Sequence, residues 1–209
     1  LERHVMRSED PAIWTAVLLY YGQPLLWANR QRAIRLIQSI WDRFPAAFAD
    51  THAAEFLWRN RDLVASGVMK AIRDDWLAGN DAGNRQAAGE LLMATVLLDP
   101  QDKAASAGLA QVLAGPETPE RLGALFAASA VWHDDFPALR QEAHRVLMQF
   151  ARHAKGHDAV AIASAMSHRA LLADALTKEL LSAVTDNPAV LSICISRGFT
   201  RDLQELLHQ

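Results

Sequence analysis

The sequence predicts an all-α protein, an α-solenoid of stacked helical hairpins that forms a single domain over residues 1–209. Three observations lead to this fold class. A short motif recurs three times at one interval, apolar residues fall at helical spacing along the chain, and no stretch alternates apolar with polar residues for long. With 51% hydrophobic and 22% charged residues, the chain has the composition of a globular protein, so we expect it to bury a substantial core.

The recurring motif reads Arg-Gln, any residue, Ala, two further residues and then two aliphatic residues. Its three arginines are 55 residues apart, and the chain contains no other Arg-Gln pair. A small Ala lets neighbouring helices approach closely, and the aliphatic pair would join a buried stripe, so we interpret the motif as a packing module. The module residues are Arg30, Gln31 and Ala33; Arg85, Gln86 and Ala88; and Arg140, Gln141 and Ala143.

The interval divides the chain into about three repeats, which cover residues 8–62, 63–117 and 118–172. In the first repeat, Ser8-Glu9-Asp10 before Pro11 is typical of a helix start, since Pro favours the first helical position. The motif helix of this repeat is predicted to end at Pro45, because proline cannot continue a helix interior. Its apolar residues at helical spacing are Ile34, Ile37, Trp41 and Phe44.

The second and third repeats carry similar signals. In the second, Val64, Val68, Ile72 and Trp76 lie at helical spacing, and Pro100 is predicted to end the motif helix. In the third, Thr118 and Pro119 predict a helix start, and Lys155-Gly156 is predicted to end the motif helix, because glycine is common after a helix terminus.

Residues 173–209 no longer follow the register and are predicted to form a cap of three short helices, as expected for a terminal repeat. Asn187 and Pro188 predict the start of one of them. The whole chain is expected to hold about ten or eleven helices joined by short turns.

The motif resembles the second helix of HEAT and armadillo-like repeats, in which an Arg, an Ala and aliphatic residues recur in that order. Asp81 and either Asp134 or Asp135 stand where such repeats often carry an acid that faces the Arg. The resemblance is one of fold, covers roughly residues 8–172, and implies a stack of helical hairpins.

Composition narrows the setting of the protein. A net charge of −3 provides no overall positive field for nucleic acid or an anionic membrane. The single cysteine, Cys194, cannot form an internal disulfide, and together with the lack of an evident signal peptide or membrane span this favours the cytoplasm. The sequence does not begin with methionine, so we expect it to be part of a larger multidomain protein.

Catalytic patterns are sparse. His133-Asp134 resembles the metal-binding pair of HD-type phosphohydrolases, in which imidazole and carboxylate hold a divalent ion, but the further His that such enzymes need is missing upstream. His153 and His157 have the i, i+4 spacing of a possible metal pair, with the helix breaker Gly156 between them. The sequence also lacks a nucleophile elbow and a phosphate-binding loop, so it favours a non-enzymatic role without a cofactor.

A solenoid without catalytic groups predicts a surface that recognises another protein or a peptide segment, as a scaffold or sensor. Tryptophan and arginine are favoured where partners bind. The candidate partner-binding residues are Trp27, Arg32, Arg35, Trp58 and Arg59. The alternative partner is nucleic acid, because Arg30, Arg32 and Arg35 could form a basic stripe on one helix.

Overall fold

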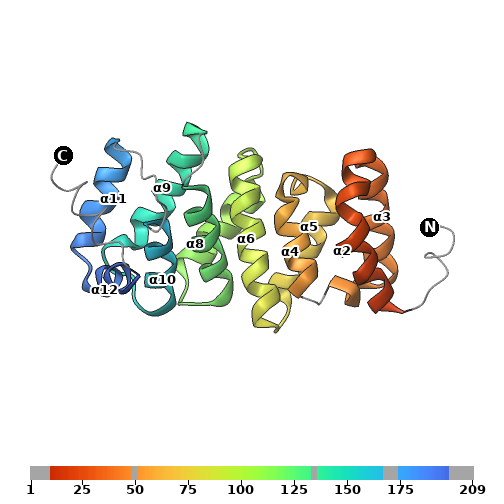
Figure 1. The fold of residues 1–209 in the computed structure, drawn as a ribbon, viewed down its shortest axis with the longest axis horizontal. Helices are drawn as coiled ribbons and strands as arrows, with labels where there is room; N and C mark the ends of the chain where they lie inside the picture. Colours follow the sequence, from red (N-terminus) through yellow and green to blue (C-terminus); the bar gives the residue numbers. More distant parts are fainter. Residues whose placement is uncertain (1–9, 49–50, 133–135, 167–173, 198–209) are drawn as a thin grey trace.

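The computed structural model describes residues 10–48, 51–132, 136–166 and 174–197 (Figure 1). Every regular element within these ranges is a helix, so the predicted all-α class is confirmed. No helix within these ranges combines the length and the apolar character that crossing a bilayer requires. In chain order the elements are α2 (Pro11–Ala28), α3 (Arg30–Arg43), η1 (Pro45–Phe48), α4 (Thr51–Arg59), η2 (Arg61–Leu63), α5 (Gly67–Ala78), α6 (Ala82–Leu98), α7 (Lys103–Ala114), α8 (Pro119–Val131), α9 (Pro137–Ala151), α10 (Gly156–Ala165), α11 (Ala175–Thr185) and α12 (Pro188–Ser196).

The helices are arranged in an elongated array that runs from α2 and α3 at one end to α11 and α12 at the other (Figure 1). In one row, α2, α4, α6, α8, α10 and α12 each pack against the next. Beside this row, α3 contacts α5 and α9 contacts α11, while α7 packs on α6 and α8. Most neighbours are therefore either consecutive helices or next-but-one helices.

Side-chain caps explain where several helices begin. The side chains of Asp81, Asp102, Thr118 and Asp174 each accept a hydrogen bond from a backbone N–H in the first turn of the helix that follows. The predicted starts at Thr118-Pro119 and Asn187-Pro188 are confirmed as the N-caps and first residues of α8 and α12. These local signals are strong because they depend only on residues close in sequence.

One predicted helix end differs. Lys155-Gly156 was expected to end the motif helix of the third repeat, but α9 already ends at Ala151. Gly156 instead opens α10 with φ of +52°, a left-handed conformation that glycine adopts without the steric cost of a Cβ. Gly156 does lie between two helices, but it begins α10 and does not end α9.

The core consists of two clusters of buried apolar residues that meet at α6. Ala88 and Leu91 of α6 belong to the cluster toward α2, whereas Leu92 and Met93 belong to the cluster toward α12. Most of α6 is buried, as expected for a helix that has neighbours on several sides. Trp58 of α4 packs against both clusters.

The recurring motif and the helix pair have different periods. Arg30 lies on α3, Arg85 on α6 and Arg140 on α9, so each 55-residue interval spans three helices and moves the motif from one row to the other. By contrast, three successive helices of one row, α6, α8 and α10, begin 37 residues apart, at Ala82, Pro119 and Gly156. The predicted repeat limits and the cap stay predictions.

Candidate functional site

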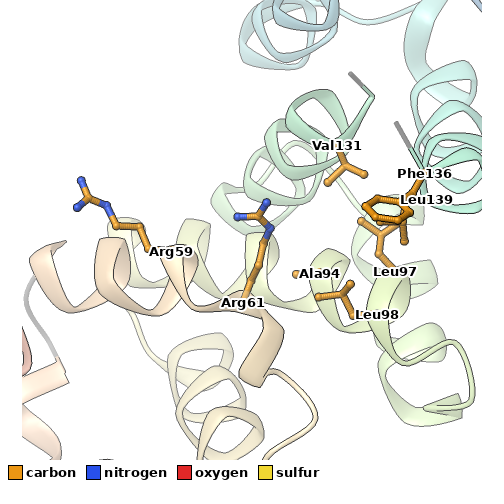
Figure 2. A pocket seen from close by; sticks show the side chains of 8 residues that line it. All are labelled: Arg59, Arg61, Ala94, Leu97, Leu98, Val131, Phe136 and Leu139. Atoms are coloured by element: carbon orange, nitrogen blue, oxygen red, sulfur yellow. The ribbon is translucent and has the colours of Figure 1, made fainter. Parts of the chain in front are cut away.

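A cavity of about 350 Å³ lies where η2, α6, α8 and α9 meet. Its volume falls in the range of pockets that hold small ligands or single side chains of a partner. Figure 2 shows the side chains that line it. They are Arg59, Arg61, Ala94, Leu97, Leu98, Val131, Phe136 and Leu139.

Helix termini supply the apolar wall. Ala94, Leu97 and Leu98 lie at i, i+3 and i+4 spacing in the last turns of α6, so they share one face of that helix. Val131 is the last residue of α8, and Leu139 lies in the first turn of α9. The wall is therefore assembled from three helices.

Two large apolar side chains of this wall are open to solvent. Leu98 is 46% exposed, and Phe136, directly before α9, is 67% exposed. Phe136 occupies the N-cap position of α9, where a hydroxyl or carboxylate would normally accept a hydrogen bond, and its side chain makes no such bond. An apolar N-cap beside an apolar cavity is a local feature that helix formation does not require.

The other side of the cavity carries positive charge. The guanidinium of Arg61 lies over the ring of Trp58, 5.0 Å from the ring centroid, which is a cation–π arrangement. Trp58 itself packs against both core clusters, so the ring beneath Arg61 is anchored in the core. No carboxylate of the described residues pairs with Arg61. In Figure 2, Arg61 lies between the apolar side chains and Arg59, which points away from the cavity.

The predicted partner-binding residues divide between two places. Trp58 and Arg59 lie at this cavity, Trp58 as the support of Arg61 and Arg59 in the lining. Trp27, which is 80% exposed, lies near the end of α2, and Arg32 and Arg35 are exposed on α3, at the far end of the array (Figure 1). The structure therefore does not bring all five residues into one surface.

Sequence reasoning did not find Arg61, Leu98 or Phe136. A usable signal existed for Phe136, because a phenylalanine stood where the turn before Pro137 would favour a capping side chain. Leu98 directly precedes the predicted stop at Asp99-Pro100 and reads as the last core residue of its helix. Nothing in the local sequence distinguishes Arg61 from Arg59.

The three motif arginines lie in three different environments. Arg30 is exposed at the first position of α3, whereas the Nη2 of Arg85 donates to Oε1 of Glu120 at 2.7 Å. Arg140 is buried, donates to Asp174, to the hydroxyl of Thr177 and to the carbonyl of Trp132, and stacks on the ring of Trp132.

The acids expected to face these arginines are corrected by the structure. Asp81 caps the backbone N–H of Asn84 rather than pairing with Arg85, whose partner Glu120 comes from the next helix of the row. Asp134 and Asp135 lie outside the described residues, and Asp174 is the acid that pairs with Arg140. The partners come from helices two elements further along the chain, so local spacing could not identify them.

The pairs of Arg85 and Arg140 belong to a wider set of ion pairs between next-but-one helices. In each, a cation in the first turn of one helix reaches an acid at the start of the helix two elements later. The pairs are Lys70 with Asp102, Arg140 with Asp174, Arg85 with Glu120, and Arg121 with Asp158. Such pairs join neighbouring hairpins, and none of their eight residues lines the cavity, so we assign them to the architecture of the array.

The structure does not assemble a metal site or an activated nucleophile from the candidate residues that it describes. His133 and Asp134 lie outside the described residues, and no cluster of three or more metal-ligating side chains occurs within the described ranges. His157 lies beside Glu117, with 3.1 Å between Nδ1 and Oε1. Burial raises the pKa of the Cys194 thiol to about 11, which keeps it protonated and weakly nucleophilic.

The cavity is thus an apolar wall with two exposed side chains, faced by a stacked arginine. Comparison of the chain with protein-family models, with curated proteins and with solved structures finds no significant match.

Proposed function

We propose that this protein is an α-solenoid of helical hairpins that serves as a protein-interaction domain, and that it binds a segment of another protein at the cavity between η2, α6, α8 and α9. The observation that carries this proposal is the cavity itself, where Leu98 and Phe136 stay open to solvent beside about 350 Å³ of space. Exposed apolar side chains that gather at a cavity are a feature of binding sites, whereas isolated ones are common on any surface.

Two further features support the solenoid. Three successive helices of one row, α6, α8 and α10, begin at a 37-residue spacing, and ion pairs join next-but-one helices of the chain at equivalent positions in the first turn. Stacked helical repeats use contacts of this kind, since each unit packs only on its neighbours. A rigid row of helices holds the cavity open and requires little ordering when a partner binds.

The nucleic-acid alternative rests on Arg32 and Arg35 of α3. Both are exposed, but the same helix carries Asp42, and the net charge of the chain is −3. Binding to phosphates would have to come from a short local stripe. The cavity offers a more specific geometry, so we favour a protein partner.

The experiment uses affinity capture from an extract of the source cells, with proteins quantified by mass spectrometry. Leu98→Asp and Phe136→Asp are each expected to lower the amount of a specifically captured protein at least about tenfold, because an ionised carboxylate cannot enter an apolar contact without a large desolvation penalty. Ile195→Asp is the matched control, since Ile195 is similarly exposed, at 51%, but lies on α12 away from the cavity.

Equal capture by all three variants would show that the cavity is not the binding surface. Circular dichroism of each variant separates a loss of binding from a loss of folding.

A further inference from the structure

The cavity has a definite chemical polarity, which restricts the segment that could occupy it. Of the lining residues, six are apolar, two are arginines, and none is acidic. The apolar residues come from α6, α8, α9 and the residue before α9, whereas both arginines come from the end of α4 and the start of η2. One wall therefore favours an apolar side chain, and the opposite wall favours an anion.

Arg61 is the group best placed to bind that anion. The Cζ of its guanidinium lies over the Trp58 ring, 5.0 Å from the ring centroid, and a planar guanidinium carries its five N–H groups along its edge. A stacked guanidinium has already lost much of its side-chain freedom, so it loses little more when it forms a hydrogen bond. No carboxylate of the described residues uses these donors.

We infer that the partner segment presents an aliphatic or aromatic side chain next to an aspartate or glutamate. The apolar side chain enters the cavity between Leu97, Leu98 and Phe136, and the neighbouring carboxylate accepts hydrogen bonds from Arg61. Arg59, from the end of α4, lies on the same side of the cavity as Arg61 (Figure 2). This inference rests on the proposed function, because it names the chemistry of the segment at the proposed site.

The test measures the fluorescence anisotropy of labelled eight-residue peptides that are blocked at both ends. The first peptide carries a leucine pair flanked by two glutamates. In the second, glutamines replace the glutamates; in the third, alanines replace the leucines; a fourth carries the leucines and glutamines with a free terminal carboxylate. The first peptide is expected to bind at least about tenfold more tightly than each of the others, as an arginine–carboxylate pair beside an apolar contact would require.

Arg61→Gln is expected to lower the affinity for the glutamate peptide to that of the glutamine peptide, and to leave the affinity for the glutamine peptide unchanged. That coupling assigns the lost affinity to one pair rather than to a general loss of structure. Arg152→Gln is the matched control, because Arg152 is exposed at the far end of α9. Thermal unfolding of both variants shows whether they remain folded.

The inference is overturned if the glutamate and glutamine peptides bind equally, if the terminal carboxylate alone gives the full affinity, or if no peptide binds at about 1 mM, a very weak limit. If the glutamate and glutamine peptides bind equally and Leu98→Asp abolishes both interactions, the proposed role of the carboxylate is wrong, but the cavity remains a protein-binding site. A cavity variant that captures the same proteins as the wild type would overturn the proposed function itself.

Discussion

Helices α6 and α8 approach so closely that only glycine fits at two positions of their contact. A Cβ on Gly89 would lie 1.9 Å from the backbone oxygen of Glu120, and a Cβ on Gly123 would lie 1.9 Å from the backbone oxygen of Gln86. Both obstacles are main-chain atoms, which cannot rotate away as a side chain can. Gly89→Ala is therefore expected to force the two helices apart.

The size of the effect follows from the distances. Ordinary contact for a Cβ begins near 3.4 Å, so the helices must separate locally by about 1.5 Å. Overpacking of a core costs typically about 1–3 kcal/mol, and we expect the upper end here because backbone must move. Alanine in a helix interior restores about 1 kcal/mol through its better helix propensity. The net loss in the free energy of unfolding is therefore about 2 kcal/mol.

Gly108 provides the matched control. It lies inside α7, where an added Cβ would meet only the side chain of Leu92 at 3.7 Å, an ordinary contact. Gly108→Ala is therefore expected to stabilise the protein by about 0.5–1 kcal/mol. Urea denaturation followed by circular dichroism measures both variants. For a chain of this size, Gly89→Ala should lower the melting temperature by roughly 4–8 °C. A Gly89→Ala variant as stable as the wild type would refute the close packing of α6 on α8.

Three titratable groups give further predictions. Arg140 and the backbone N–H of Thr177 lower the pKa of Asp174 to about 2, so the stability it contributes is present above pH 4 and is lost as the pH falls toward 2. Asp174→Asn should cost about 1 kcal/mol at pH 6, after allowance for its partial exposure, and much less at pH 2.5; a pH-independent difference in urea denaturation would contradict this. Burial raises the pKa of Glu90 to about 7, so the stability of the protein falls as the pH rises from about 4.5 to 7. Glu90→Gln should therefore be more stable than the wild type by about 1–3 kcal/mol at pH 8, but not at pH 4. Buried Cys194 should react with a thiol reagent such as dithiobisnitrobenzoate only after unfolding in urea, and a rapid reaction of the native protein would place it at the surface.

The helical class and several helix starts could be predicted because their causes are local. Thr118 accepts a hydrogen bond from the N–H of Arg121, three residues away, and Pro119 follows it at the first helical position. Asn187 before Pro188 repeats this logic at α12. A capping side chain and the N–H it binds lie within one turn, so a single stretch of sequence contains the whole interaction.

The pairing of helices could not be predicted in the same way. The Arg-Gln motif repeats identical letters at 55 residues, yet Arg85 pairs with Glu120 at a separation of 35 residues and Arg140 with Asp174 at 34. At corresponding positions of other helices the cation is Lys70 and the acid is Asp102. Equivalent ion pairs that use different residue types produce no repeated motif in the sequence.

The cavity could not be predicted from the sequence for a related reason. Its walls come from Arg61, Leu98 and Leu139, which lie far apart in the sequence and each read as an ordinary residue of its own helix. Only the placement of helix ends in space makes them a site. The sequence suggested Trp58 and Arg59 as partner-binding residues through their types alone, and it could not show that Trp58 acts by supporting a neighbouring arginine.

The close packing of α6 and α8 also bears on the cavity. The two helices touch at Gly89 and Gly123, in the N-terminal half of each, and both contribute their last residues, Leu97, Leu98 and Val131, to the cavity wall. They therefore run side by side in the same direction, and a shift at the glycine contact moves the wall as well. Gly89→Ala should thus lower the affinity for the glutamate peptide, whereas Gly108→Ala should leave it unchanged, although neither residue lines the cavity. Peptide affinity retained in a destabilised Gly89→Ala variant would show that the wall is set by local packing around α9 and not by the α6–α8 contact.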